Sequence, residues 1–179
     1  MQQDATERVK FLEQLYRAGS VLVEQLRRQY GFAHPGLSRA ADSKASQRST
    51  VVRGDVMPIR IGARTSIQDN TVIHVTTDMH PTVIAEEVTI GHAAIVHGCT
   101  VKRGALIGMG ARILDGAVVG ESALIGAGAL VSEGMHIPPR TLAIGVPARV
   151  KRDLTDEEVQ RLEFSWRHYV EYKDKYPRG

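Results

Sequence analysis

An apolar residue recurs at every sixth position through the centre of this chain, and this period constrains the fold more than any other feature. One uninterrupted run comprises Val101, Ile107, Ile113, Val119, Ile125 and Val131. Two shorter runs precede it, at Ile61, Ile67 and Ile73 and then at Ile84, Ile90 and Val96. Helices repeat every 3.6 residues and strands every two, so a period of six predicts a solenoid of stacked coils.

The repeat predicts a parallel β-helix from about residue 51 to residue 133, followed by a loop that contains Pro138, Pro139 and Pro147. Each apolar side chain would face the axis, and three faces would close one coil of about 18 residues, with coils stacked roughly 4.8 Å apart. Corners need a positive φ, which suits the small residues that follow inward positions by three places: Gly104, Gly110, Gly116, Gly128 and, in the same phase, Asn70. A β-sandwich, with strands eight to twelve residues apart, does not explain this period.

Composition excludes several other classes of protein. The 179 residues suffice for one core, and a net charge of +3 without a basic run rich in aromatics argues against nucleic-acid binding. No apolar stretch is long enough for a signal peptide or a membrane span, so we expect a cytoplasmic protein with no membrane partner. Cys99 is the single cysteine, which excludes an internal disulfide and fits a reducing compartment.

The two ends of the chain differ from the repeat. Residues 1–50 are atypical: residues 6–29 carry apolar residues near helical spacing, and residues 33–50 have the composition of a loop. A divergent cap or a shifted reading frame upstream of Val51 would both produce such a segment. We expect a β-helix domain over residues 51–150, and then a helix over residues 151–179. The Thr155-x-x-Glu158 capping box would open this helix, which would continue to about Tyr176.

Three histidines inside the repeat, His74, His92 and His97, predict a catalytic metal site. Neutral imidazole is the commonest metal ligand, and three imidazoles without an obvious fourth ligand leave one coordination position open. His74 and His97 each follow an inward residue by one place, whereas His92 follows one by two places. A single chain would struggle to close this triad, but a ring of identical subunits could supply His92 from a neighbour. Zn²⁺ is the expected ion, and Fe²⁺ or Co²⁺ would also fit.

The segments RGDVMPIRIGARTSIQD, VIHVTT, VTIGHAAIVHGCTV and ALIGMGA together resemble the gamma-class carbonic anhydrases. These are left-handed β-helix proteins of the hexapeptide-repeat superfamily, and the resemblance covers residues 51 to about 176. With the helical signals at both ends, the expected fold is all-β, a left-handed parallel β-helix with N-terminal and C-terminal α-helices. The resemblance implies a homotrimer that hydrates carbon dioxide reversibly to bicarbonate through a metal-bound hydroxide.

The resemblance also implies roles for polar residues near the histidines. Gln68 would orient the hydroxide by a hydrogen bond, and Arg53 and Asp55 of the Arg-Gly-Asp sequence would bridge subunits near the metal. Asp69 would support Arg53. Tyr169 stands where related proteins carry a tyrosine near the pocket, although packing of the C-terminal helix would equally explain it.

Some residues depart from the pattern of that family. Ser66 stands where the family usually has Asn, and Val56 stands where its best-known archaeal type has Glu. The loop between His74 and His92 lacks the acidic insertion that would shuttle protons, which leaves His80 as a candidate relay. We therefore expect a slow enzyme, or one that is silent as purified.

Two other functions remain compatible with the scaffold. A hexapeptide acyltransferase or thioester hydrolase would need a histidine base at a subunit cleft and a tunnel for a pantetheine arm, but no metal. A non-enzymatic assembly subunit would use the trimer and its helices as an interaction platform. Product formation that survives chelation would favour the first, and a stable partner without hydration activity would favour the second.

The atypical N-terminal segment generates a first prediction. The end of a β-helix exposes apolar side chains and unpaired strand edges, and the stripe of Val9, Leu12, Leu15 and Leu26 could cover this end near Val51, Val52 and Ile59. Deleting residues 1–32 should then make the protein insoluble or lower its melting temperature markedly. A truncated trimer that keeps its solubility, metal and stability would show that the segment is not a cap.

Overall fold

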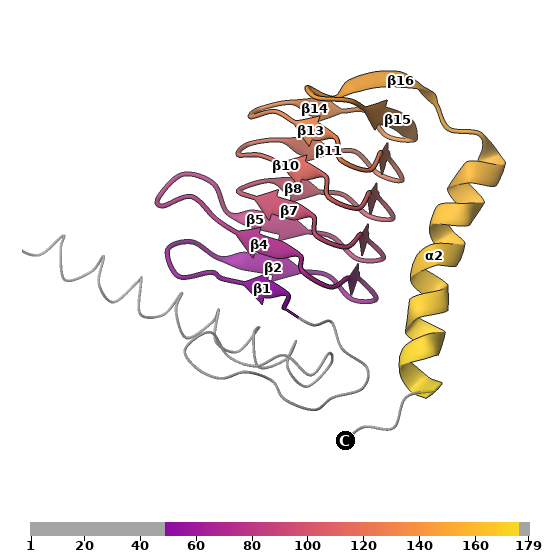
Figure 1. Cartoon of the computed structure of the whole chain (residues 1–179), viewed down its shortest axis with the longest axis horizontal. Helices are drawn as coiled ribbons and strands as arrows, with labels where there is room; N and C mark the ends of the chain where they lie inside the picture. The colour runs from indigo at the N-terminus through magenta and orange to yellow at the C-terminus, as the bar shows by residue number, and fades with distance from the viewer. Residues whose placement is uncertain (1–48, 176–179) are drawn as a thin grey trace, which may run out of the picture.

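The structure is a computed structural model that describes residues 49–175, with side chains described through Glu171. The helix expected over residues 6–29 and nearly all of the loop expected over residues 33–50 lie outside the described residues. Within them, the chain winds into stacked coils, and one long helix lies along the outside of the stack (Figure 1). No helix in the described part combines the length and the apolar composition needed to cross a lipid bilayer.

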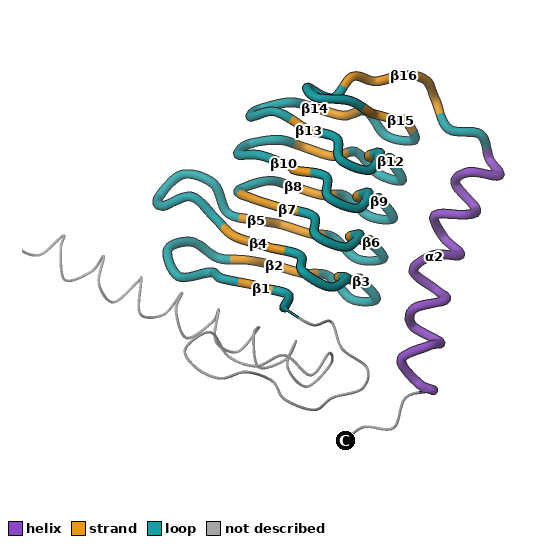
Figure 2. The backbone as a smooth tube through the Cα atoms, in the orientation of Figure 1, coloured by secondary structure: helices purple, strands orange, loops and turns teal. Residues whose placement is uncertain are grey.

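Each coil contributes one short strand to each of three sheets (Figure 2). The first sheet contains β1 (Val51–Val52), β4 (Val72–His74), β7 (Ile95–His97), β10 (Arg112–Ile113) and β13 (Leu130–Val131). The second sheet contains β2 (Ile59–Ile61), β5 (Thr82–Ile84), β8 (Thr100–Val101), β11 (Val118–Val119) and β14 (His136–Ile137). The third sheet contains β3 (Ser66–Ile67), β6 (Thr89–Ile90), β9 (Leu106–Ile107), β12 (Leu124–Ile125), β15 (Thr141–Ile144) and β16 (Arg149–Asp153). All neighbouring strands are parallel except β15 and β16, so the predicted left-handed parallel β-helix is confirmed.

The six-residue period corresponds to one buried side chain on each face of each coil. Ile73, Val96, Ile113 and Val131 occupy one such column in the first sheet, and each exposes 0% of its surface. The other two sheets contribute equivalent columns, which together form one continuous apolar core. The described fold therefore rests on the burial of small branched side chains, each of which stabilises it by roughly 1.5–3 kcal/mol relative to exposure.

The β-helix extends beyond the limit predicted from the sequence. Residues after 133 were expected to form a loop, but Ile137 and Ala143 continue the inward columns of the second and third sheets and are 2% and 0% exposed. Pro138 and Pro139 lie at the corner between β14 and β15, where a residue without an N–H group is tolerated because it need not donate to the ladder. The prediction of a loop was wrong because the sequence alone does not distinguish prolines at a corner within the β-helix from prolines that follow its last coil.

The predicted corner positions are confirmed. Asn70 has a φ of 61°, and the glycines in the same phase, among them Gly104 and Gly116, also have positive φ. A second set of glycines directly follows the inward residues. A Cβ on Gly108 would lie 2.5 Å from the backbone nitrogen of Ala127 in the next coil, so only glycine permits this spacing between coils.

The corner between the first and second sheets is irregular in the lower coils. Residues 53–58 connect β1 to β2 and residues 75–81 connect β4 to β5, and these two loops project beyond the other corners (Figure 1). In the next coil the connection is unusually short, since only Gly98 and Cys99 separate β7 from β8. The six-residue period is therefore interrupted at one edge of the solenoid, around His74 and His97.

The helix α2 (Asp156–Lys175) covers the third sheet. The predicted capping box is confirmed, because the Glu158 N–H donates to Thr155 Oγ1 at 3.2 Å and the Thr155 N–H donates to Glu158 Oε2 at 2.9 Å. A hydrogen bond from Arg152, followed by one from the Thr155 backbone, lowers the pKa of Glu158 to about 2. The helix docks through an apolar cluster of Leu154, Val159 and Leu162 against Leu106, Leu124 and Leu142.

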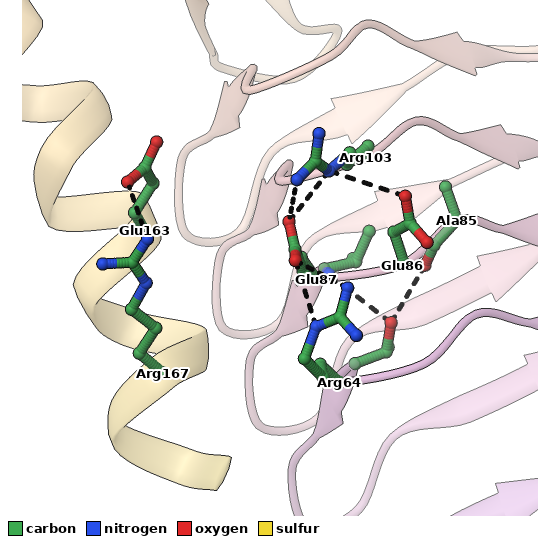
Figure 3. A network of polar contacts seen from close by, with 9 residues as sticks. Arg64, Ala85, Glu86, Glu87, Arg103, Glu163 and Arg167 are labelled. Atoms are coloured by element: carbon green, nitrogen blue, oxygen red, sulfur yellow. Dashed lines mark hydrogen bonds and ion pairs between the residues drawn. The ribbon is translucent and has the colours of Figure 1, made fainter. Parts of the chain in front are cut away.

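An ionic cluster stabilises the corner between the second and third sheets (Figure 3). Arg64 from below and Arg103 from above donate to the buried carboxylate of Glu87 at distances of 2.8–3.0 Å. The guanidinium of Arg64 also lies 5.8 Å from the centre of the Trp166 ring, so the cluster reaches α2. Burial alone raises the pKa of Glu87, but the hydrogen bonds from Arg64 and Arg103 outweigh it and hold the pKa below its ordinary value of 4.5.

This cluster predicts the effect of Glu87→Gln. The free energy of unfolding at pH 7 should fall by about 1–2 kcal/mol, because two ion pairs become hydrogen bonds from charged arginines to an uncharged amide, while the half-exposed arginines moderate the loss. Since the pKa of Glu87 is lowered in the folded state, the advantage of the wild type should be complete above about pH 4.5 and should shrink as the pH falls further. Urea denaturation at fixed protein concentration measures both effects.

Glu86→Gln is the matched control for this experiment. The Glu86 carboxylate lies 3.6 Å from Arg103 and is half exposed, so this variant should change the stability by less than about 0.5 kcal/mol. Equal effects of the two variants would contradict a special role for the buried carboxylate.

Candidate metal centre

His74 and His97 lie side by side on the outer face of the first sheet. They pair in register between β4 and β7, and their ring centroids are 5.0 Å apart. Nδ1 of His74 lies 3.0 Å from Nε2 of His97, so one nitrogen of each ring points at the other ring. The prediction that these two residues project alike therefore agrees with the structure.

A carboxylate lies behind each ring. Asp115 Oδ1, from the corner one coil above, lies 2.6 Å from His97 Nδ1, and Asp55 Oδ1, from the projecting loop below, lies 3.1 Å from His74 Nε2. Arg53 Nη2 also lies 2.7 Å from His74 Nε2, and Arg53 Nε lies 3.3 Å from Asp55 Oδ2. Arg53 and Asp55, both singled out from the sequence, thus flank the same histidine.

These contacts determine which ring nitrogens can carry protons. A carboxylate only accepts, so His97 Nδ1–H donates to Asp115 and His97 Nε2 keeps its lone pair. His74 has two options: its Nε2 accepts from Arg53 while Nδ1–H donates to His97, or its Nε2–H donates to Asp55. In the second arrangement two lone pairs 3.0 Å apart converge, and they repel each other unless a cation lies between them.

The donor set and its spacing fit a transition-metal ion. Two nitrogen ligands of a tetrahedral Zn²⁺ ion lie about 3.3 Å apart, close to the 3.0 Å that separates the facing nitrogens of His74 and His97. Metal-binding histidines usually donate the other ring N–H to a carboxylate, and Asp115 and Asp55 are placed to accept these bonds. His74 and His97 therefore fit two of the ligand positions of such a metal site.

The two carboxylates are held in their charged form. Burial raises the pKa of Asp115. Hydrogen bonds from Thr76 and His97, together with the charges of His97 and His80, lower it by more than burial raises it, so the pKa lies below its ordinary value of 3.8. Burial also raises the pKa of Asp55, but the hydrogen bond with His74 and the charge of Arg53 outweigh it, so this pKa too lies below its ordinary value. His80, the candidate proton relay from the sequence, lies close enough to Asp115 for its charge to lower the pKa of this carboxyl.

His92 lies on a different edge of the solenoid, in the turn after β6 between the third and first sheets. Its backbone N–H donates to Gln68 Oε1 at 3.1 Å, and Gln68 Nε2 donates to the hydroxyl of Tyr169 on α2 at 2.8 Å. His92 Nδ1 lies 3.6 Å from Asp69 Oδ2. Gln68, Asp69 and Tyr169 are thus grouped with His92 rather than with the other two histidines, and Tyr169 does more than pack.

Within the described residues, no three His, Cys, Asp or Glu side chains of one chain gather into a metal-binding group. The sequence-derived residues instead form two half-sites. The first, which we call the histidine-pair half-site, contains Arg53, Asp55, His74 and His97. The second, the His92 half-site, contains Gln68, Asp69, His92 and Tyr169.

Sequence reasoning missed Asp115 and Thr76. The hydroxyl of Thr76 donates a short hydrogen bond to Asp115 Oδ2, while Asp115 Oδ1 faces His97. The spacing along the chain does not predict this contact, because β7 and β10 pair with an offset of 17 residues, with Val96 opposite Ile113. Asp115 therefore lies one residue beyond the position that stacks on His97, and it reaches the ring only because the corner after His97 is short.

Three relatives show what this architecture is similar to. A carbonic anhydrase of Geobacillus kaustophilus is 49% identical over 123 residues, which span 69% of this chain and 67% of the relative. The protein YrdA of Escherichia coli is 42% identical over 144 residues, or 77% of this chain and 78% of the relative. A crystal structure of a hexapeptide transferase family protein from Anaplasma phagocytophilum has a TM-score of 0.69 at 40% identity, covering 73% of this chain and 76% of that one.

No protein-family model matches the chain. The identity with these relatives, the share of each that is covered and the common β-helix nevertheless define the class. The chain belongs to the gamma-class carbonic anhydrase-like proteins of the hexapeptide-repeat superfamily.

Proposed function

We propose that this protein is a homotrimer that catalyses the reversible hydration of carbon dioxide to bicarbonate at a metal site shared between subunits. The observation that carries the proposal is the facing pair of nitrogens on His74 and His97, each backed by a carboxylate. His92 of a neighbouring subunit would supply the third nitrogen. The relatives named carbonic anhydrase support the reaction, since they share 49% and 44% identity with this chain.

Exposed side chains at the His92 half-site support the proposal that a second copy of the chain binds there. The His92 side chain is 49% exposed, and Met109 lies beside it in the next coil and is 59% exposed. The Gly110 N–H donates to the His92 carbonyl, which fixes these two corners against each other. An apolar side chain next to a half-exposed histidine suits a surface that another subunit covers. Arg53 and Asp55, each about half exposed, are placed to contact that subunit.

Zn²⁺ is the proposed ion, with Fe²⁺ or Co²⁺ as alternatives, and such an ion would lower the pKa of a bound water to about 7 and so provide a nucleophile at neutral pH. His74 and His97 would hold it together with His92 of the neighbour. Asp55 would keep the His74 ring oriented by accepting its Nε2–H. A protonated His74 Nε2 cannot accept a hydrogen bond from Arg53, so the Arg53 guanidinium would be available to donate to the bicarbonate product.

Gln68 is held at both ends of its amide, by the His92 backbone and by Tyr169. An amide fixed in this way presents its groups in one direction, which suits the orientation of a small substrate beside His92. Tyr169 would act as a positioning residue, because α2 carries its hydroxyl to Gln68.

The buried thiol of Cys99, whose pKa is raised to about 12 by burial, fits a protein of a reducing compartment such as the cytoplasm.

Stopped-flow measurement of carbon dioxide hydration tests the activity. We expect activity from protein loaded with zinc, or with iron under anaerobic conditions, and loss of at least about 100-fold in His97→Ala because the metal is no longer held. Arg112→Ala, an exposed change in the neighbouring strand β10, should leave the rate within about twofold of the wild type. Absence of metal-dependent hydration in both loaded forms would refute the proposed reaction.

Mixing two inactive variants tests whether subunits share the site. His92→Ala and His97→Ala should each abolish metal binding alone. Co-refolded in equal amounts, they should recover about a quarter of the wild-type metal content, because one interface in four pairs an intact histidine pair with an intact His92. A site built within one chain would recover nothing.

The matched control mixes His74→Ala with His97→Ala. Both changes damage the histidine-pair half-site, so no interface in this mixture is complete and no metal should be recovered. Recovery here would contradict the assignment of His74 and His97 to the same subunit. Metal content per chain, measured by elemental analysis after gel filtration, reads out both mixtures.

A second candidate function has one observation in its favour. A groove of about 560 Å³ lies along the edge of the second sheet, at the corner that leads to the third sheet, and could accept a small amphiphile; its lining includes Lys102, Arg103, Val118, His136 and Pro138. His136 would be the base of an acyltransferase there, in keeping with the hexapeptide transferase family protein of similar fold. Acyl-CoA-dependent product formation that persists after complete chelation would support this function over hydration.

A further inference from the structure

The histidine-pair half-site coincides with two departures from the six-residue repeat. The projecting loop of residues 75–81 begins directly after His74 and brings Thr76 back to the edge of the solenoid, within reach of Asp115. The short Gly98–Cys99 corner begins directly after His97. Asp115, at the regular corner between β10 and β11 one coil above, reaches both Thr76 and His97.

We propose that Asp115, held by Thr76, is the positioning residue that fixes the ring orientation and the tautomer of His97 for metal binding. This inference rests on the proposed metal site. Both carboxylate oxygens are used: Oδ1 accepts from His97 Nδ1, and Oδ2 accepts from the Thr76 hydroxyl. With its Nδ1 committed to Asp115, His97 presents Nε2 as the only nitrogen with a free lone pair, and this nitrogen faces His74.

The Gly98 corner makes room for this carboxylate. A Cβ at position 98 would lie 2.3 Å from Asp115 Oδ1 and 2.9 Å from the His80 Cβ, and the φ of Gly98 is +51°. Any other residue there would displace the carboxylate from His97 or strain the backbone. The shortened corner and the glycine therefore serve the contact between Asp115 and His97.

Asp115 is also the more enclosed of the two carboxylates behind the histidines. Its side chain is 20% exposed, against 48% for Asp55, and Asp55 shares His74 with Arg53. Among the interactions described for residues 49–175, Asp115 accepts from His97 and Thr76 and forms no ion pair with an arginine or a lysine. Asp115 therefore makes its direct hydrogen bond to the imidazole of His97, with His80 as a second charged group nearby. A carboxylate in this position orients a histidine and strengthens it as a metal ligand.

Titration of the metal-free protein with Co²⁺ tests the proposal, because the visible absorption of bound Co²⁺ reports both affinity and coordination geometry. Asp115→Asn keeps the shape and one acceptor oxygen but removes the charge, and it should weaken Co²⁺ binding about 10- to 100-fold and alter the absorption spectrum. Thr76→Val removes only the supporting hydroxyl and should weaken binding several-fold. The melting temperature of each metal-free variant should fall by no more than a few degrees, because the hydrogen bonds that are lost lie at a partly exposed edge, and this fall should not account for the loss of Co²⁺ affinity.

Glu133→Gln is the matched control. Glu133 stands one coil above Asp115 at the same corner, because β10 and β13 pair Ile113 with Val131, and its side chain is exposed. It removes an equivalent carboxylate and should leave Co²⁺ affinity within about twofold of the wild type.

The outcomes separate this inference from the proposed function. Unchanged Co²⁺ affinity in Asp115→Asn, or a loss matched by Glu133→Gln, or a loss that tracks an equal fall in the melting temperature of the metal-free protein, would overturn the positioning role. A wild-type protein that binds no metal would overturn both proposals. A wild-type protein that binds Co²⁺ tightly but does not hydrate carbon dioxide would remove the proposed reaction and leave the role of Asp115 supported.

Discussion

Each coil of the β-helix packs one apolar side chain per face against the coils above and below, and the parallel backbone ladder between coils joins these layers at a fixed spacing. Ile73, Val96, Ile113 and Val131 belong to one such column, and all four are fully buried. Because the inward residues fix the position of every strand, the corners between sheets are free to change length without disturbing the core. The corners are therefore where this scaffold can acquire chemistry.

The chemistry-bearing residues gather at two different edges. One edge carries the loops of residues 53–58 and 75–81 and the shortened corner after His97, which together place Arg53, Asp55 and Asp115 around two imidazoles. The other edge keeps regular corners and carries His92 with Gln68. Because the solenoid holds these edges apart, the proposed metal site would require a second copy of the chain to bring its own edge to the first.

The C-terminal helix links the stability of the fold to the second edge. Leu154, Val159 and Leu162 attach α2 to the third sheet, and Arg64 extends the ionic cluster around Glu87 toward Trp166 on the helix. The same helix carries Tyr169 to Gln68. Contacts that dock α2 far from the histidines thereby set the orientation of an amide beside His92.

The sequence by itself determined the β-helix, the inward column, the corner positions and the capping box at Thr155, because each depends on short-range periodicity or on the conformation of single residues. It also suggested that His74 and His97 project alike and that His92 points elsewhere. Only the tertiary structure showed that the last coil passes through Pro138 and Pro139, and that Asp115 and Thr76 support His97. Corners of variable length change which residues stack from one coil to the next, so contacts across them depend on three-dimensional register rather than on spacing along the chain.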